Sequence, residues 1–146
     1  VYGALEDILN VGIVVKDVKT DIIIDNDDHN ARAFGEWVVC SDKNCYGGDS
    51  YTTESGGVFE YQVPVSGTFE LAMRWSYDTT RAARVPVVVY DGSGLLDVVY
   101  IDQRRNGSQW NVLGEYSFTD EGRIFIVSAS EGSTCADAVK LTQASQ

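Results

Sequence analysis

The strongest constraint on the fold is a period of two in the pattern of apolar side chains. Within residues 68–75, large apolar side chains at Phe69, Leu71 and Met73 alternate with smaller or charged ones. Successive side chains of a β-strand point to opposite faces, so this alternation predicts a strand with one buried face and one solvated face. Similar segments rich in Val, Ile, Tyr, Phe and Thr recur along the chain, and clusters of Gly, Asn, Asp and Ser separate them.

These segments predict an all-β chain, because no stretch shows continuous helical periodicity. The predicted strands are 21–24, 34–40, 58–65, 68–75, 85–90, 95–103, 110–118, 123–129 and 136–142. The polar residues 46–57 are expected to form a loop, since they are rich in Gly, Ser and Thr. Residues 85–90 are nearly all β-branched, which predicts a central strand covered on both faces. Roughly eight or nine short strands at this spacing are typical of a two-sheet sandwich.

Length and charge limit what such a chain can do. Its 146 residues suffice for one domain, and 22 acidic against 11 basic residues give a net charge of −11. This charge repels phosphate backbones and anionic lipid, so we expect no nucleic-acid partner. We also expect no membrane insertion, because no apolar run approaches ~20 residues. The single histidine and the lack of a recognisable nucleophile motif predict a protein that is not an enzyme.

Three cysteines, Cys40, Cys45 and Cys135, bear on the redox state of the protein. The four polar residues between Cys40 and Cys45 are long enough for a local disulfide, and we predict one there, with Cys135 as the remaining thiol. The alternative is that the cysteines are reduced and buried. Zinc is less favoured, because no close C-x-x-C pair is present.

A series of short motifs follows in order along residues 22–142. They are Ile24-Asp25-Asn26 with Asp28, Phe34-Gly35-x-Trp37, Tyr46-Gly47 with Tyr51, Phe59-x-Tyr61, Val63-Pro64, Gly67-x-Phe69, Met73-x-Trp75, Arg81-Ala82, Val85-Pro86-Val87, Gln103, Gly107-x-x-Trp110-x-x-Leu113-Gly114 and Ala136-Asp137-Ala138-Val139. Their order and spacing resemble the golvesin/xanthan-lyase carbohydrate-binding-like domain family. The resemblance implies a jelly-roll-like β-sandwich over residues 22–146 that serves as an accessory module of secreted bacterial proteins. Residues 1–21 form an extension outside it.

The acidic turn that contains Asp25, Asp27 and Asp28 supplies carboxylate oxygens close together, which is the ligand type that calcium prefers. The turn lacks the glycine and the bidentate glutamate of an EF-hand loop. The structural alternative is that these carboxylates accept backbone N–H groups and hold the turn, and this alternative is favoured. No other cofactor is expected.

Aromatic residues are candidates for sugar stacking. Tyr46, Tyr51 and Tyr77 fall in predicted loops, and Trp110 follows a turn, so these four are the candidate carbohydrate-binding residues. Trp37 and Trp75 lie in strand-like patterns, where aromatic side chains usually pack in the core.

Residues Leu9, Val11, Ile13 and Val15 alternate with neighbours that are mostly polar or small, which predicts an extension strand outside the sandwich. Such a strand either pairs with its own sheet or completes the sheet of a second copy by strand addition. Head-to-tail addition would propagate as a filament. We therefore expect a secreted, non-catalytic structural or adhesive protein at the cell surface or outside a bacterial cell, assembling with copies of itself. The alternative is a carbohydrate-binding module that binds polysaccharide. Because the chain begins at Val1, we also expect a mature or trimmed product.

Overall fold

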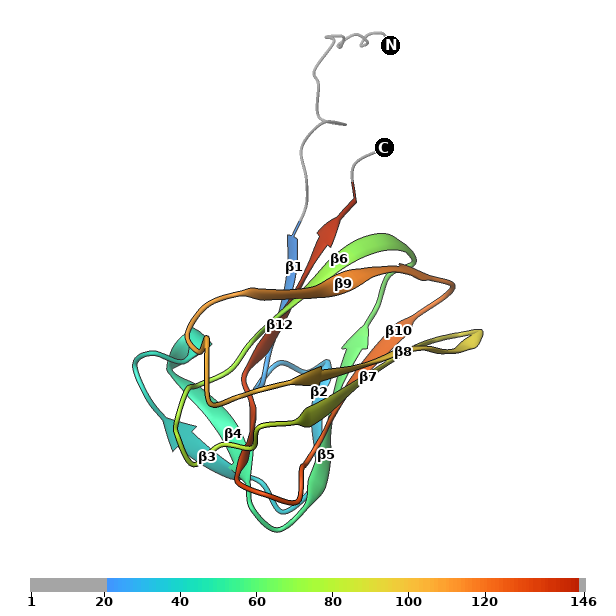
Figure 1. Ribbon diagram of the computed structural model, residues 1–146. Helices are drawn as coiled ribbons and strands as arrows, with labels where there is room; N and C mark the ends of the chain where they lie inside the picture. The colour runs from blue at the N-terminus through green and yellow to red at the C-terminus, as the bar shows by residue number, and fades with distance from the viewer. Residues whose placement is uncertain (1–20, 145–146) are drawn as a thin grey trace, which may run out of the picture.

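The computed structural model describes residues 21–144, and nearly all of its regular structure is antiparallel β-strand (Figure 1). The strands are β1 (Asp21–Asp25), β2 (Ala31–Gly35), β3 (Val38–Ser41), β4 (Asp49–Thr53), β5 (Gly57–Val63), β6 (Gly67–Arg74), β7 (Val85–Asp91), β8 (Gly94–Ile101), β9 (Asn111–Phe118), β10 (Gly122–Val127), β11 (Thr134–Ala136) and β12 (Ala138–Gln143). A short 3₁₀ turn, η2 (Tyr46–Gly48), precedes β4. The all-β prediction is confirmed. The part of the chain that the structure describes has no helix long and apolar enough to cross a membrane.

Two sheets form the layers of the sandwich. One has the strand order β1-β12-β6-β9 and the other has the order β2-β5-β10-β7-β8. The inward-facing side chains of both sheets form one buried cluster, in which Leu71 and Val139 of the first sheet join Tyr61 and Ile124 of the second. The period-two segment 68–75 is β6, and its predicted inner residues are buried.

A third, three-stranded sheet of order β11-β4-β3 was not predicted (Figure 1). The predicted strand 34–40 is divided into two strands. Strand β2 ends at Gly35, whose φ is 98°, and β3 begins after Trp37. The predicted loop 46–57 contains β4, whose Tyr and Thr residues favour extended backbone despite their polarity. The predicted strand 136–142 is interrupted at Asp137.

Strand β7 also differs from the prediction. It lies between β10 and β8, and its inner residues Val85, Val87 and Val89 are fully buried. Its outer residues Pro86, Val88 and Tyr90 are only half-buried. The strand is therefore covered on one face only. The predicted extension strand with Leu9, Val11, Ile13 and Val15 lies outside the described residues.

Candidate functional site

The outer face of the five-stranded sheet, here called the five-stranded face, follows from the strand register, because cross-strand partners share a face. One row across the sheet is Arg32, Glu60, Phe125, Val88 and Val98. A neighbouring row is Gln62, Arg123, Tyr90 and Leu95. On the other side of the first row, Phe34 pairs with Val58, Val58 pairs with Val127, and Pro86 pairs with Tyr100. Apolar and aromatic side chains thus dominate this face.

Exposure singles out this face from the rest of the surface. Phe34 is 47% exposed, Tyr100 49%, Val98 40% and Leu95 57%, and these are half of the strongly exposed large apolar residues between 21 and 144. Contiguous apolar patches of this kind on a folded domain mark interaction sites. Phe34 and Tyr100 lie on the two edge strands, so the face is about 19 Å wide at a strand spacing of ~4.8 Å.

Guanidinium groups lie against the aromatic rings of this face. The Arg84 Cζ atom is 3.8 Å from the centroid of the Tyr100 ring. Arg123 Cζ is 5.3 Å from the centroid of Phe125, and its Nε atom is 3.6 Å from the Glu60 carboxylate. These distances are those of cation–π contacts, which hold the planar groups close to the rings.

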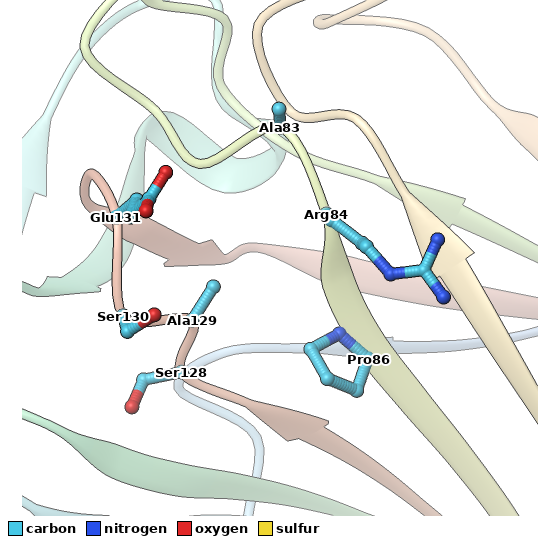
Figure 2. Close-up of a pocket in the computed structure, with 7 residues that line it drawn as sticks. All are labelled: Ala83, Arg84, Pro86, Ser128, Ala129, Ser130 and Glu131. Atoms are coloured by element: carbon cyan, nitrogen blue, oxygen red, sulfur yellow. The ribbon is translucent and has the colours of Figure 1, made fainter.

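A cleft opens at one end of the five-stranded face (Figure 2). Its volume is about 490 Å³, and Ala83, Arg84 and Pro86 line one side while residues 128–131 line the other. Figure 2 shows the Arg84 guanidinium extending away from Glu131, toward the sheet. A second hollow of about 360 Å³ lies at the other end, between Tyr90 and Arg123 and the turns that follow β7 and β9. Both volumes are within the range of small-ligand clefts.

Basic side chains outnumber acidic ones on the strands of this face, although Glu131 lines the cleft and Asp91, Asp120 and Glu121 line the second hollow. Arg32, Arg84 and Arg123 lie on it or at its edge, and Glu60 is paired with Arg123. Between residues 21 and 144, neither Arg32 nor Arg84 has a carboxylate within ion-pair distance. Two guanidinium groups thus lack a counter-charge on a chain whose net charge is −11.

The predicted aromatic candidates do not form one platform. Tyr46 and Trp110 do meet, with ring centroids 5.8 Å apart, and Lys140 Nζ is 5.0 Å from the Trp110 centroid. Both rings are half-buried near the four-stranded sheet. Tyr51 instead packs on the buried Phe59 ring, at 5.7 Å.

Tyr77, the fourth candidate, is 52% exposed in the loop after β6, where its backbone lies against Gly107. Trp75 is buried as expected, and Trp37 is half-buried with its Nε1 donating to the Phe34 carbonyl at 3.0 Å.

The acidic turn is held by its own hydrogen bonds. Asp28 Oδ1 accepts the Asn30 N–H at 3.0 Å and lies 3.2 Å from His29 Nδ1, while Asp27 is exposed. Between residues 21 and 144, no three His, Cys, Asp or Glu side chains form a group that could hold a metal ion. The predicted set of Asp25, Asp27 and Asp28 therefore does not form a metal site, and the Asp25 carboxylate lies against Gly47 of η2.

The three cysteines are free thiols, so the predicted bridge between Cys40 and Cys45 is not formed. Cys40 is half-buried on β3. Cys45 is directed into the interior, where its Sγ lies 3.5 Å from Ser50 Oγ, and burial raises its pKa to about 11. Cys40 is the cross-strand partner of Ser50, so both cysteines lie near this residue, but no bond joins them.

The sequence model of the golvesin C-terminal domain family matches residues 22–143. The chain belongs to this family. A xanthan lyase from Bacillus sp. (strain GL1) is 28% identical over 133 residues, which are 82% of this chain and 14% of that protein. The structure of a Paenibacillus xanthan lyase matches 86% of this chain and 13% of its own length, with a TM-score of 0.78 and 34% identity. The chain thus spans about a seventh of these relatives.

The fold itself is shared more widely. A family 35 carbohydrate-binding module from Clostridium thermocellum superposes with a TM-score of 0.62 at 19% identity, over 86% of this chain and 99% of the module. At this identity the similarity concerns the fold alone. The five-stranded face could not be found from the sequence motifs, because Tyr100, Leu95 and Val98 lie outside them.

Proposed function

We propose that this domain is a non-catalytic carbohydrate-binding module and that its ligand lies along the five-stranded face. The observation that carries the proposal is the exposed aromatic and apolar surface ending in the cleft beside Arg84. Aromatic rings present flat apolar faces to the C–H faces of a sugar ring. The guanidinium, hydroxyl and carboxylate groups of the cleft supply the donors and acceptors that sugar hydroxyls require.

The family relationship supports this assignment. The relatives are large xanthan lyases of which this domain is a small part, and an isolated carbohydrate-binding module shares the fold. We infer that the domain acts outside a bacterial cell, where such polysaccharides occur, and that it holds polymer for a partner activity. The unpaired charges of Arg32 and Arg84 favour an acidic polysaccharide over a neutral one.

Self-assembly into a filament is a separate prediction. It depends on Leu9, Val11, Ile13 and Val15, which lie outside the described residues, and no observation between residues 21 and 144 favours it over carbohydrate binding. Electron microscopy of the full chain, compared with a variant that lacks residues 1–20, tests it directly. Filaments formed by the full chain and lost in the truncated chain are the expected result of strand addition.

Affinity gel electrophoresis tests the binding surface, with xanthan as the acidic probe and β-mannan as the neutral one. We expect xanthan to retard the wild-type domain and Tyr100→Ala to lose most of that retardation. Tyr77→Ala is the matched control, since Tyr77 has the same side chain and a similar exposed fraction. Loss of binding in Trp110→Ala with Tyr100→Ala unaffected would place the ligand at the Tyr46–Trp110 pair instead. No retardation by either polymer, with dimers in size-exclusion chromatography that Tyr100→Ala disrupts, would make the face a protein interface.

A further inference from the structure

Strand β3, the outer strand of the three-stranded sheet, has an unpaired edge. Among the described strands only β4 pairs with it, in continuous antiparallel register. Val38 is 64% exposed and its neighbour Val39 is 57% exposed. Successive side chains of a strand point to opposite faces, so β3 is open to solvent on both faces as well as along its edge.

The other sheet edges in the described part of the chain have features that hinder pairing with a further strand. Strand β1 begins and ends with aspartate, β2 carries Arg32, and β11 is fully buried. The pairings of β8 and β9 with their neighbours each contain a register shift. Strand β3 has no charged residue, no proline and no register shift. An unprotected apolar edge of this kind is a template for an added strand.

A groove of about 340 Å³ lies beside the Val38 end of β3. It is lined by Val38, Glu36 and residues 52–55. Glu36 and Glu54 are exposed, and within residues 21–144 neither has a cation at ion-pair distance. A strand added to β3 would therefore have one end next to two negative charges, which favours a segment with a basic residue at that end.

The chain contains a segment with these properties outside the described residues. In residues 9–15 every second side chain is a large aliphatic one, and Lys16 follows directly. No proline, which would remove a pairing N–H group, occurs before residue 21. Antiparallel addition of this segment would bring Lys16 to the Val38 end of β3, next to Glu36 and Glu54.

The position of β1 favours a second copy over the same chain as the source of the segment. Asn26, which follows β1, donates through Nδ2 to Asp49 at the start of β4, so the end of β1 lies near β3. Asp21, where the segment joins β1, lies about 14 Å back along the strand. Figure 1 shows the start of β1 at the top of the view and β3 toward the lower left. Residues 17–20 span at most ~14 Å, so they would be used up in returning along β1.

We propose that β3 is the acceptor edge for residues 9–16 of a second copy of this chain. The added segment extends the three-stranded sheet by one strand, and its aliphatic side chains cover Val38 and Val39, while main-chain hydrogen bonds supply affinity. Because donor and acceptor lie at opposite ends of the domain, the contact is heterologous and propagates. The inference names the acceptor for the predicted filament. It is independent of the five-stranded face, to which β3 does not belong.

Sedimentation velocity of the full chain over a range of concentrations tests the acceptor. We expect the wild type to form species larger than a monomer. Val39→Lys should raise the concentration needed by at least about 10-fold, because a charged edge residue hinders strand pairing. Val112→Lys is the matched control, since Val112 is 61% exposed on β9, at the edge of a different sheet. This variant has the same charge and should assemble as the wild type does.

Charge reversal tests the orientation of the added segment. Lys16→Glu should weaken assembly by up to about 5-fold, the range of an exposed ion pair. Glu36→Lys in the same chain should restore assembly, because the two charges again have opposite signs. Glu115→Lys is the control for net charge, since Glu115 is exposed on β9 and should not restore it.

A wild type that stays monomeric at every concentration would overturn the proposal. Equal assembly of Val39→Lys and the wild type would also overturn it, as would an equal loss in both lysine variants. Xanthan retardation of the two lysine variants should be the same, because neither residue lies on the five-stranded face. Assembly and xanthan binding are thus measured on the same proteins, so failure of this inference is distinguished from failure of the proposed carbohydrate function.

Discussion

The guanidinium carbon of Arg84, the residue that precedes β7, lies 3.8 Å from the centroid of the Tyr100 ring on the neighbouring strand β8, at the edge of the five-stranded face. This stacking extends the flat surface of the tyrosine and directs N–H donors to its rim. Tyr100 belongs to the exposed five-stranded face, and Arg84 belongs to the cleft at its end. A sugar bound to the five-stranded face would therefore meet the positively charged Arg84 guanidinium, held in place by the tyrosine ring, at the cleft.

Replacement of Arg84 tests this arrangement. We expect Arg84→Ala to weaken xanthan binding by about 2- to 30-fold, the range of a cation–π contact. Arg84→Lys should recover only part of the loss, because an ammonium group lacks the planar fork that stacks and donates in parallel. Isothermal titration measures both. Arg105→Ala is the control, since this exposed arginine lies in the turn after β8, off the five-stranded face. Equal binding in Arg84→Ala and Arg105→Ala would exclude Arg84 from the site.

The charge of the face predicts a dependence on ionic strength. Binding of an acidic polysaccharide should weaken steadily as NaCl rises from low to physiological concentration, because salt screens exposed charges over about 8–10 Å. Binding of any neutral polymer should change little over the same range. Gel retardation in a salt series with xanthan and β-mannan measures the difference. If salt has no effect on xanthan retention, the guanidinium groups do not contribute charge to recognition, and stacking alone accounts for binding.

The strands could be predicted more completely than the binding surface. Alternation identified β6, since its outer residues are polar or small. Strand β8 gave no such signal, because Leu95 and Leu96 are both apolar, as are Val98 and Val99. Ordinary alternation directs Val98 to the outer face and Val99 to the inner face, and a register shift opposite Val89 and Tyr90 places Leu95 on the outer face with Tyr90. A strand that is apolar on both faces is predicted to be buried on both. The sequence therefore cannot distinguish a strand with one exposed apolar face from a core strand before the register is known.

The carboxylates around Asp25 show a different limit of sequence reasoning. The sequence places Asp25 beside Asp27 and Asp28, and the structure adds Asp49 and Asp137 to its charged neighbours. Asp137 lies in the A-D-A-V motif, where two strands of different sheets meet. Only the antiparallel pairing of β1 with β12, which places Asp25 opposite Ala138, brings the two ends of the domain together. Local spacing carries no information on such a contact.

The Tyr61 hydroxyl gives a prediction about stability. Tyr61 is fully buried, and its hydroxyl accepts or donates no hydrogen bond within residues 21–144. Tyr61→Phe should therefore leave the free energy of unfolding unchanged or raise it by up to about 1 kcal/mol, because an unsatisfied polar group is removed without a change in shape. Phe59→Ala on the same strand should lower it by about 3–5 kcal/mol. Urea unfolding measures both variants. A clear loss of stability in Tyr61→Phe would mean that the hydroxyl has a partner, such as an ordered water molecule.

The thiols give the last prediction, which concerns the redox state of the mature protein. Cys45 is 4% exposed and Cys135 is fully buried, and burial raises the pKa of both thiols, which suppresses the reactive thiolate. Brief alkylation of the native protein without reductant should therefore add one group, at the half-buried Cys40, and alkylation after unfolding should add three. The Cys40→Ser variant should lose the fast adduct and keep the two slow ones. Intact mass spectrometry counts the adducts in each state. A single adduct on the unfolded, unreduced protein, mapped to Cys135, would instead establish the Cys40–Cys45 bridge that the sequence spacing predicts.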